Sequence, residues 1–490
     1  MLYQSTRSNH TVNSLEAILQ GIAPDGGLYL PKDLASLSLP PQQMADKSFE
    51  EMAAIILQTL FDEFTPSEMA EMVHRAYGGK FETDDVTPTV KVGKDYVLEL
   101  FRGPTSAFKD VALSMLPVLI TEAKKKLGIT EKIMILTATS GDTGKAALEG
   151  FHDVEGTGII VFYPNGGVSA VQKAQMVTQE GSNVTVCAID GNFDDAQTGV
   201  KNTFAACAAR DLKKHGVMLS SANSINIGRL APQIVYYYKS YCDLVAAEEI
   251  RMGDPVNFVV PTGNFGDILA GYFAKCLGLP IGKLVCASNR NDVLTEFLNT
   301  GRYDRRRTFY RTNSPSMDIL VSSNLERMLY LASGGDFQKV AAYMKALNEE
   351  GQYVVDEDLL QSLKQTFSAG CCSEDETLAT IGKTYETYGY LCDTHTAVAV
   401  NVAEQFKAAD PDGAIIILST ASPYKFPVSV LSALGETPDA DEFKVMEQLN
   451  QRTDVPVPAG LAGLKERAVL HTDVIGKDSI LDYVLKKVEV

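Results

Sequence analysis

The sequence of 490 residues lacks several features that would assign it to common classes of protein. It has no long hydrophobic run, and apolar stretches such as residues 414–418 are far too short to cross a bilayer, which excludes a membrane-spanning chain. Positive charge is scarce relative to negative charge. The formal net charge of −18 argues against nucleic acid as a partner, because its phosphates would be repelled. An anionic ligand would need a local cationic pocket.

Metal-ligating residues are also few and scattered. The six histidines lie singly along the chain, which argues against a zinc site, and the eight cysteines show no metal-ligand spacing. The cysteines do not form the pattern of a small disulfide scaffold either, so we expect reduced thiols and a cytoplasmic protein. Residues 1–15 contain no apolar signal core, which agrees with that expectation. Neither a GxGxxG fingerprint nor a P-loop occurs.

From residue 91 onward, short β-branched runs alternate with helical periods. The runs expected as strands are residues 133–137, 159–163, 184–189, 217–220, 256–260, 284–287 and 413–420. This alternation predicts parallel sheets covered by helices on both faces, with ligands bound at the carboxyl ends of the strands. The patterns before residue 91 and over 323–390 are mainly helical. A chain of this length predicts two or three domains.

The segment 103–113 places one lysine, Lys109, between an aromatic and an acidic residue. Apolar residues at helical spacing predict a helix over 110–127, so Lys109 lies at its start. The positive end of the helix dipole repels a cation there and favours the neutral amine, which is the form that attacks an aldehyde. We interpret Lys109 as a candidate for a covalent bond to a cofactor. The alternative is a solvated surface lysine.

A glycine-rich loop follows the strand expected at 256–260 and opens a helix. Its residues are Gly263, Asn264, Phe265, Gly266 and Asp267. Glycines let the backbone approach a ligand closely, so several N–H groups and the helix N-terminus could bind one phosphate. A plain turn between strand and helix is the alternative interpretation.

A second loop of this kind occupies residues 137–145. Ser140, Thr143 and the local amides could hold a carboxylate, while Lys145 could bind a second anion. Thr143 could instead be only the N-cap of the following helix. Further along, the strand at 413–420 ends in Thr420, whose hydroxyl could bind an unprotonated pyridine nitrogen or could be satisfied within the protein.

Together these segments resemble the threonine synthase family, whose members are pyridoxal-phosphate enzymes with the tryptophan-synthase-β-like fold (fold type II). The resemblance runs nearly from end to end. Besides the segments above, it includes residues 3–7, 21–31, 314–319, 321–327, 393–397 and 420–426. Residues 3–7 and the stretch Ser-Pro-Ser-Met-Asp at 314–318 resemble threonine synthases of the bacterial and fungal type in particular.

The resemblance implies an α/β protein with two domains based on parallel sheets and a mostly helical N-terminal domain. The expected boundaries are 1–90 for the N-terminal domain, 91–225 for a smaller α/β domain, 226–435 for a larger α/β domain with the phosphate cup, and 436–490 for a C-terminal extension packing on the larger domain. The cofactor expected from the resemblance is pyridoxal 5′-phosphate.

Carried over to this sequence, the resemblance also implies roles for individual residues. Lys109 would form the Schiff base with the cofactor and act as the catalytic acid and base. Phe108 would lie near the cofactor ring, and Thr420 would be the partner of its nitrogen. Gly263, Asn264, Phe265, Gly266 and Asp267 would form the phosphate cup, and Ser140, Gly141, Asp142 and Thr143 would hold the substrate carboxylate. Apart from the resemblance, our candidates for the substrate phosphate are Lys145, which departs from the usually small residue of the family, Asn226 and Arg229. An exposed arginine at a helix start is the alternative interpretation of Arg229.

The activity implied by the resemblance is the conversion of O-phospho-L-homoserine and water to L-threonine and phosphate. One alternative is a phospholyase on the same scaffold, which would release 2-oxobutyrate and ammonia. Another is a catalytically silent relative that serves as a binding protein. We expect a small-molecule substrate and neither a nucleic acid nor a membrane as partner; both a monomer and a homodimer stay open.

Overall fold

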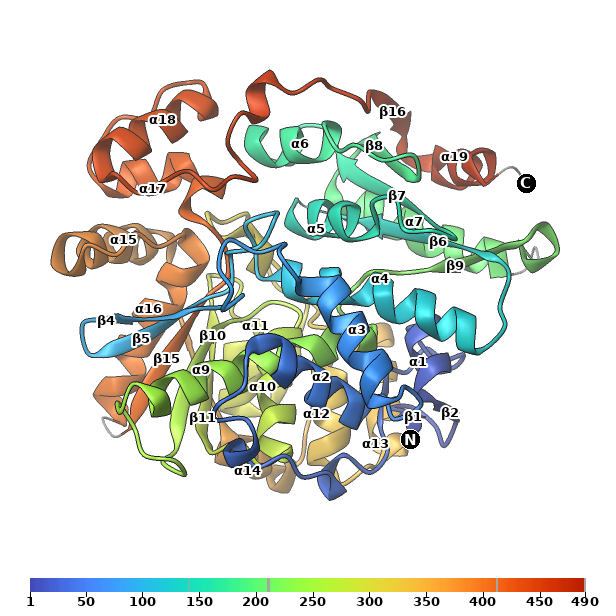
Figure 1. The fold of residues 1–490 in the computed structure, drawn as a ribbon, viewed down its shortest axis with the longest axis horizontal. Coiled ribbons are helices and arrows are strands. Elements are labelled where there is room, and N and C mark those ends of the chain that lie inside the picture. Colours follow the sequence, from blue (N-terminus) through green and yellow to red (C-terminus); the bar gives the residue numbers. More distant parts are fainter. Residues whose placement is uncertain (140, 209–211, 411–412, 489–490) are drawn as a thin grey trace.

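The computed structural model describes residues 1–139, 141–208, 212–410 and 413–488, and two mostly parallel sheets dominate it (Figure 1). The larger sheet has the strand order β14-β11-β10-β15-β5-β4. Its strands are β4 (Thr89–Val92), β5 (Asp95–Glu99), β10 (Val256–Pro261), β11 (Ile281–Ser288), β14 (Phe367–Cys371) and β15 (Ala414–Ser419). Neighbouring strands are parallel except for β4 and β5, which form an antiparallel hairpin at one edge.

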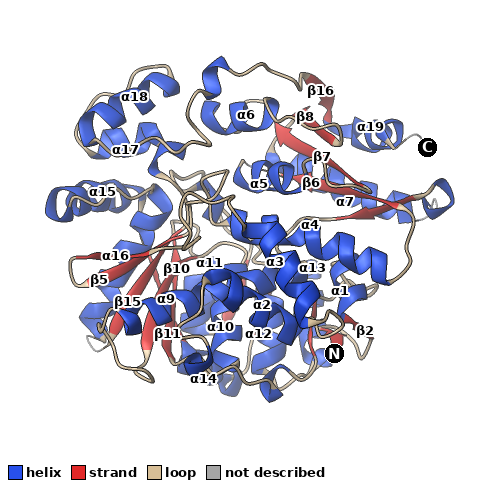
Figure 2. Ribbon diagram, viewed as in Figure 1, coloured by secondary structure: helices blue, strands red, loops and turns tan. Residues whose placement is uncertain are grey.

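The larger sheet is buried on both faces. Val259 of β10 packs in one cluster with Val398 and Val402, whereas Phe258 and Val260 of the same strand belong to a second cluster. Because successive side chains of a strand point to opposite faces, these clusters lie on the two sides of the sheet. The helices of this part are α9 (Ile234–Ala246), α10 (Gly266–Cys276), α11 (Val293–Thr300), α12 (Leu325–Ala332), α13 (Phe337–Glu349), α14 (Glu357–Thr366), α15 (Glu374–Tyr388) and α16 (Thr394–Ala409), and the short strands β12 (Arg302–Asp304) and β13 (Gln352–Val354) form a separate pair. Figure 2 shows helices beside the strands of this sheet, among them α10 and α16.

The smaller sheet is entirely parallel and has the order β16-β8-β7-β6-β9. Its strands are β6 (Lys132–Ala138), β7 (Thr157–Pro164), β8 (Val184–Asp190), β9 (Val217–Ser220) and β16 (Asp473–Gly476), and its helices are α5 (Asp142–Phe151), α6 (Ala170–Val177), α7 (Phe193–Ala208) and α19 (Ile480–Lys487). Leu136 and Ile160 pack with Val484 of α19, while Ile135 and Ile159 face the core shared with the rest of the molecule.

The N-terminal region combines helices with a small antiparallel sheet. The elements are β1 (Leu2–Ser5), β2 (Thr11–Asn13), β3 (Tyr29–Pro31), α1 (Ser14–Gln20), α2 (Phe49–Leu60) and α3 (Pro66–Tyr77). Each helix begins at a capping box, in which the side chains of Asn13, Ser48 and Thr65 bind backbone N–H groups of the first turn. Arg7, just after β1, donates to both carboxylate oxygens of Glu326 on α12, which joins this region to the larger sheet.

The C-terminal part differs from its expected position. Helices α17 (Pro427–Ala433) and α18 (Glu442–Thr453) pack on each other, and α17 also packs on α15. We expected all of 436–490 to pack on the larger domain. Instead, β16 pairs with β8 of the smaller sheet and α19 packs on α7, as Figure 1 shows at the upper right. Sequence periodicity marks a short edge strand poorly and does not reveal its pairing partner.

The predicted strands are confirmed, with ends that shift by up to three residues. Three strands of the larger sheet, β4, β5 and β14, were not predicted. The hairpin of β4 and β5 also places residues 89–99 in the larger sheet, whereas the expected smaller domain began at residue 91. The assignment of a strand to a sheet depends on pairing with residues distant in sequence, here β15, so local pattern does not determine it. The domain boundaries stay a prediction.

Helix α4 (Lys109–Lys126) packs closely against α5. Pro117 lacks an N–H group, so the carbonyl of Leu113 loses its usual helical donor. A Cβ atom built on Gly150 of α5 would come 2.0 Å from that carbonyl oxygen, so only glycine fits there. The close approach fixes the position of α5, whose first residue is Asp142, relative to α4, whose first residue is Lys109.

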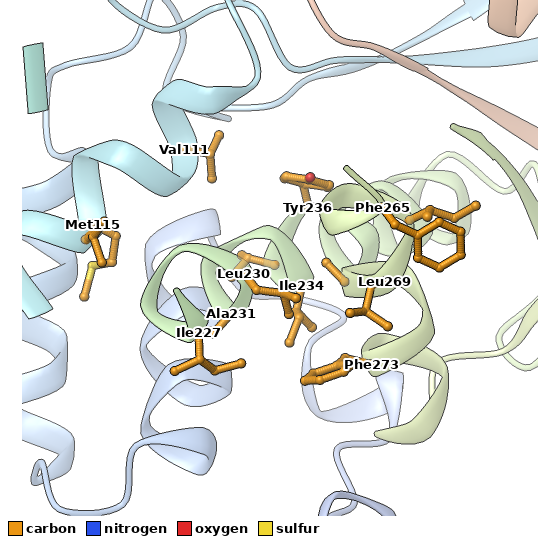
Figure 3. Packing of buried hydrophobic residues seen from close by; sticks show 14 of the residues in the cluster. Val111, Met115, Ile227, Leu230, Ala231, Ile234, Tyr236, Phe265, Leu269 and Phe273 are labelled. Atoms are coloured by element: carbon orange, nitrogen blue, oxygen red, sulfur yellow. The ribbon is translucent and has the colours of Figure 1, made fainter. Parts of the chain in front are cut away.

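A single buried cluster supports the N-termini of α4 and α10. Figure 3 shows Val111 and Met115 of α4 near Leu230 of α8 (Ile227–Leu230), with Phe265 and Leu269 at the start of α10 close by. All five side chains are buried. The glycine loop at 263–267 and Lys109 are therefore held by the same core. Among the described residues, no helix combines the length and apolar composition needed to cross a bilayer.

Candidate functional site

Lys109 lies at the carboxyl end of β15. The N–H group of Phe108 donates to the carbonyl of Thr420 at 2.8 Å, and the N–H group of Ser422 donates to the carbonyl of Ser106 at 3.1 Å. These bonds hold the turn before α4 against the residues that follow β15. Carboxyl ends of parallel strands are the usual ligand sites of such sheets, so the structure puts Lys109 where the sequence pattern expected a ligand.

Asp110 orders the turn that precedes Lys109. Its carboxylate accepts hydrogen bonds from the backbone N–H group of Thr105, at 2.8 Å, and from the hydroxyl of the same residue. Both residues are buried, and burial raises the pKa of Asp110 to about 6. The turn is thereby fixed by its own side chains.

The amine of Lys109 is buried in a mixed electrostatic environment. Its Nζ atom lies 3.8 Å from Oδ2 of Asp142 and 4.9 Å from the centroid of the Phe108 ring. Burial lowers the pKa of Lys109 to about 8; Asp142 opposes this effect, and Arg229 and Lys425 add to it. We expected the helix dipole to favour the neutral amine, whereas burial is the main cause of the lowered pKa in the structure.

The glycine loop forms a cradle between β10 and α10. Phe265 adopts a left-handed conformation, with φ at +62°, directly before the helix. The carbonyl of Gly263 accepts from the hydroxyl of Ser322 at 2.8 Å, and the carbonyl of Asn264 accepts from the N–H group of Asn324 at 3.0 Å. Because one segment, which contains Ser322 and Asn324, binds both carbonyls, it holds the glycine loop in place. Its backbone N–H groups make no hydrogen bond within the described structure.

Two details define the shape of the cradle. A Cβ atom on Gly263 would come 2.9 Å from the backbone oxygen of Ser316, so the close approach requires glycine. Oδ1 of Asp267 accepts from the hydroxyls of Tyr236, at 2.6 Å, and Tyr237, at 3.0 Å, while its buried Oδ2 atom has no partner among the described residues. Burial raises the pKa of Asp267 to about 6.

The second loop brings Asp142 beside Lys109. Ser140 lies outside the described residues. Gly141 has φ at +142°, and the hydroxyl of Thr139 accepts from the N–H groups of Gly141 and Gly144, both at 2.9 Å. Thr139 therefore caps the start of α5, and the alternative interpretation of Thr143 as the N-cap is wrong.

Asp142 makes the main polar contacts of this loop. Its Oδ1 atom lies 2.8 Å from Nζ of Lys425 and accepts from the amide of Gln172 at 2.9 Å. Although burial opposes ionisation, Lys425 and Lys109 hold the pKa of Asp142 below its usual range. Asp142 is thus a buried carboxylate between two lysines.

The three residues expected at the substrate phosphate lie in different environments. Nζ of Lys145 binds Oε2 of Glu149, at 2.9 Å, and the amide oxygen of Gln179. Asn226 donates to the carbonyl of Ile18 and accepts from the N–H group of Gly228, both at 2.9 Å. These polar groups already have partners within the protein, and their role at the substrate phosphate stays a prediction.

Arg229 keeps unused hydrogen-bonding capacity. Its Nη1 atom donates to the carbonyl of Ala222 at 2.7 Å, while its buried Nε atom has no partner among the described residues. Burial lowers the pKa of Arg229 to about 10, and its charge acts on Lys109. Of the three candidates, Arg229 is the one with a buried donor atom that has no partner among the described residues.

Several residues of the site were not predicted from the sequence. Lys425 is fully buried and also donates to the carbonyl of Thr105 at 3.0 Å. Nε2 of His395 accepts from the N–H group of Ser316 at 3.1 Å, and its Nδ1 atom lies 2.7 Å from the carboxylate of Asp393. The backbone donor at Nε2 fixes the proton on Nδ1. Lys425 and His395 lie in two of the segments that resemble the threonine synthase family, 420–426 and 393–397. Their contacts, however, become visible only in the folded structure.

Comparison with known proteins first defines the class. Residues 95–420 match the family described as pyridoxal-phosphate dependent enzyme. Residues 2–77 match the model of the threonine synthase N terminus, and residues 396–469 match the model of the threonine synthase C-terminal part. The chain belongs to the threonine synthase family. The expected tryptophan-synthase-β-like fold (fold type II) is confirmed.

Individual relatives agree with this assignment. The chain is 40% identical over 432 residues to human threonine synthase-like 1, with 86% of this chain and 58% of that protein covered. It therefore spans about three fifths of the length of that relative. It is 38% identical to threonine synthase of Saccharomyces cerevisiae, with 89% of each chain covered. The crystal structure of PLP-bound threonine synthase from Brucella melitensis superposes with a TM-score of 0.87 at 39% identity, covering 100% of this chain and 98% of that one.

The cofactor is pyridoxal 5′-phosphate, in line with the matching family and the PLP-bound structure. The residues present fit this group. Lys109 supplies a buried amine with a lowered pKa, and the loop at 263–267 supplies N–H groups at a helix N-terminus for a phosphate. A Cβ atom at Gly263 would come too close to the backbone oxygen of Ser316, so the backbone of this loop packs tightly against that segment.

Proposed function

We propose that this protein converts O-phospho-L-homoserine and water to L-threonine and phosphate. The single observation that carries the proposal is Lys109, a buried amine whose pKa is lowered to about 8, at the carboxyl end of β15. A lysine in this state can bond to an aldehyde cofactor and then exchange protons near neutral pH. Family membership supports the choice of substrate.

The residues around Lys109 divide the work. When bound, the cofactor supplies an electron sink that makes the hydrogens of the substrate α- and β-carbons acidic. Lys109 takes and returns these protons at its Nζ atom. The backbone N–H groups of Gly263, Asn264, Phe265, Gly266 and Asp267 would hold the cofactor phosphate. Phe108 would lie beside the cofactor ring, and Thr420 would bind the ring nitrogen through its side-chain hydroxyl. The side chain of Asp267 acts indirectly, because it is engaged by Tyr236 and Tyr237.

The substrate has two anionic groups that need separate partners. We assign its carboxylate to the N-terminus of α5, where Asp142 and Thr143 offer backbone N–H groups. The N–H group of Gly141 already donates to the hydroxyl of Thr139. We assign its phosphate to Arg229, whose Nε atom lacks a partner within the described residues. Because Lys109 and Asp142 are buried, bulk water is kept away from the reacting atoms. The water molecule that reacts must therefore reach the β-carbon of the substrate and no other carbon.

Product analysis tests the proposal. The purified protein, loaded with pyridoxal phosphate, is incubated with O-phospho-L-homoserine while threonine, 2-oxobutyrate and phosphate are measured together. We expect threonine and phosphate in equal amounts. Phosphate released with 2-oxobutyrate and ammonia, but without threonine, would instead identify a phospholyase. A protein that forms no product and shows no visible absorbance band with the cofactor would be a silent binding relative.

Replacement of Asp267 by alanine is expected to weaken cofactor binding by about tenfold or more. Removing this carboxylate takes one acceptor from each of the buried hydroxyls of Tyr236 and Tyr237, at a cost of about 1–3 kcal/mol, and loosens the first turn of α10. The amide oxygen of Gln233 and the backbone carbonyl of residue 267 remain as their other acceptors. A fluorescence titration of the apoprotein with pyridoxal phosphate measures the change. The matched control is Asp243→Ala on α9, where an unchanged dissociation constant is expected. Equal constants for Asp267→Ala and the native protein would contradict the prediction.

A further inference from the structure

Asp142 contacts two lysines that come from distant parts of the chain. Oδ1 lies 2.8 Å from Nζ of Lys425, and Oδ2 lies 3.8 Å from Nζ of Lys109. Gln172 donates to Oδ1 at 2.9 Å, and the hydroxyl of Ser316 donates to Oδ2 at 3.4 Å. The carboxylate belongs to the smaller sheet, whereas Lys425, in the turn after β15, and Ser316 belong to the larger one. Each of its oxygens therefore faces a different lysine, and Lys425 reaches Asp142 from the side of the larger sheet.

Burial makes these charges act strongly on one another. The side chains of Lys425 and Asp142 are 0% and 3% exposed, and that of Lys109 is 9% exposed. Lys425 has a second acceptor, the carbonyl of Thr105 at 3.0 Å, whereas the amine of Lys109 donates no hydrogen bond within the described structure. Charges that water does not screen interact over several ångströms. The protonation of Lys109 thus depends on its charged neighbours.

Charged and titratable groups from several neighbouring elements face Lys109. Asp142 on α5 and Asp110 on its own helix favour the charged form of the amine, whereas Lys425 and Arg229 disfavour it; Asp267 on α10 also interacts with Lys109. Of these carboxylates, that of Asp142 lies at ion-pair distance from Nζ of Lys109. Lys425 binds that same carboxylate and competes for it.

We propose that Asp142 and Lys425 are positioning residues that set the protonation of the Lys109 nitrogen from opposite directions. Asp142 stabilises the proton on that nitrogen. Lys425 anchors Asp142 and, as a second cation on the same carboxylate, weakens its hold on the proton. The inference rests on the proposed function, in which Lys109 must both accept and return protons. A base that binds its proton too strongly cannot release it, and one without a counter-ion cannot accept it.

The test is a pH titration of the holoenzyme without substrate, read from the visible absorbance of the bond between the cofactor and Lys109. Asp142→Asn removes the attractive charge, so its midpoint is expected to fall by about one pH unit or more. Lys425→Met removes the competing cation at similar side-chain length, so its midpoint is expected to rise. Lys425→Arg keeps the charge and is expected to restore the native midpoint.

A second readout uses the protein before the cofactor is added. The rate at which an amine-acylating reagent modifies Lys109 is followed by mass spectrometry of the peptide across pH, because only the neutral amine reacts. The same order of midpoints is expected, with Asp142→Asn lowest and Lys425→Met highest. Matched controls are Lys239→Met and Asp243→Asn, which break another pair on α9, joined at 2.5 Å, in which the lysine is buried and the aspartate half-buried. They are expected to leave both midpoints unchanged.

Each outcome has one meaning. A purely structural role would lower activity in both variants without moving the midpoints in opposite directions. Midpoints that shift in the same direction in both variants, or that do not shift, overturn the inference. If one variant does not fold, the direction of the shift in the other variant decides the test. A native holoenzyme without the visible band would instead reject the proposed function and leave the acylation experiment to decide the inference.

Discussion

Lys109→Ala is expected to lower threonine formation by at least about a thousandfold while the fold is retained. The variant loses the amine that bonds to the cofactor and also the group that moves the substrate protons, and general acid-base catalysis alone contributes about 10²–10⁴-fold. The fold should persist because the Nζ atom of Lys109 makes no hydrogen bond in the described structure and its burial disfavours the charged form. Threonine formation, the visible absorbance and the circular dichroism spectrum measure these effects.

The control for this experiment is Lys239→Ala. Lys239 is a comparably buried lysine of α9 whose ion pairs are with Asp85 and Asp243, away from the site residues described above. Its replacement is expected to preserve the visible band and most of the turnover. Near-normal threonine formation by Lys109→Ala would remove the central claim about this site.

Arg327→Ala is expected to lower the free energy of unfolding by about 3 kcal/mol or more. The guanidinium of this fully buried arginine donates to the carbonyl of Tyr29 at 2.8 Å, to the side chain of Asn324 at 2.5 Å and to the carbonyl of Ile225 at 2.5 Å. Alanine would leave these three acceptors without their donor and would open a cavity among them. Because Asn324 also binds the carbonyl of Asn264, cofactor affinity is expected to fall as well.

Urea unfolding followed by circular dichroism measures the change in stability. Arg302→Ala is the matched control, because Arg302 is exposed and pairs with Asp304 at the surface. A change within about 0.5 kcal/mol is expected for that variant. An Arg327→Ala protein with the native urea midpoint would contradict the role of this arginine in joining the N-terminal region to the larger domain.

The sequence predicted well those parts of the fold that depend on short-range pattern. Strands such as β7 and β10 are continuous apolar runs, and helices such as α2 and α3 begin at capping residues, so both are visible locally. Strand β14 was missed because its five residues, Phe-Ser-Ala-Gly-Cys, contain no apolar run, and it is an edge strand with a half-buried middle. β16 is a similarly short and exposed edge strand.

The candidate site divides in the same way. Lys109 at a helix start and the glycine loop at 263–267 were expected from the chain, because both depend on the junction of a strand or turn with a helix. The commitment of Lys145 to Glu149 and Gln179 was not, since side-chain partners are chosen by packing. Lys425 was missed for the same reason: a lysine in a sequence is a surface residue until the fold buries it.

By itself, the sequence determined the alternation of the main strands and helices after residue 91, the family resemblance and the lysine most suited to a covalent cofactor. Periodicity, capping and backbone conformation are local properties, and a sequence displays them directly. Only the tertiary structure decided which strands share a sheet and which carboxylate faces Lys109. Ion pairing and burial depend on atoms brought together from distant segments, as Asp142 of the smaller sheet meets Lys109 and Lys425.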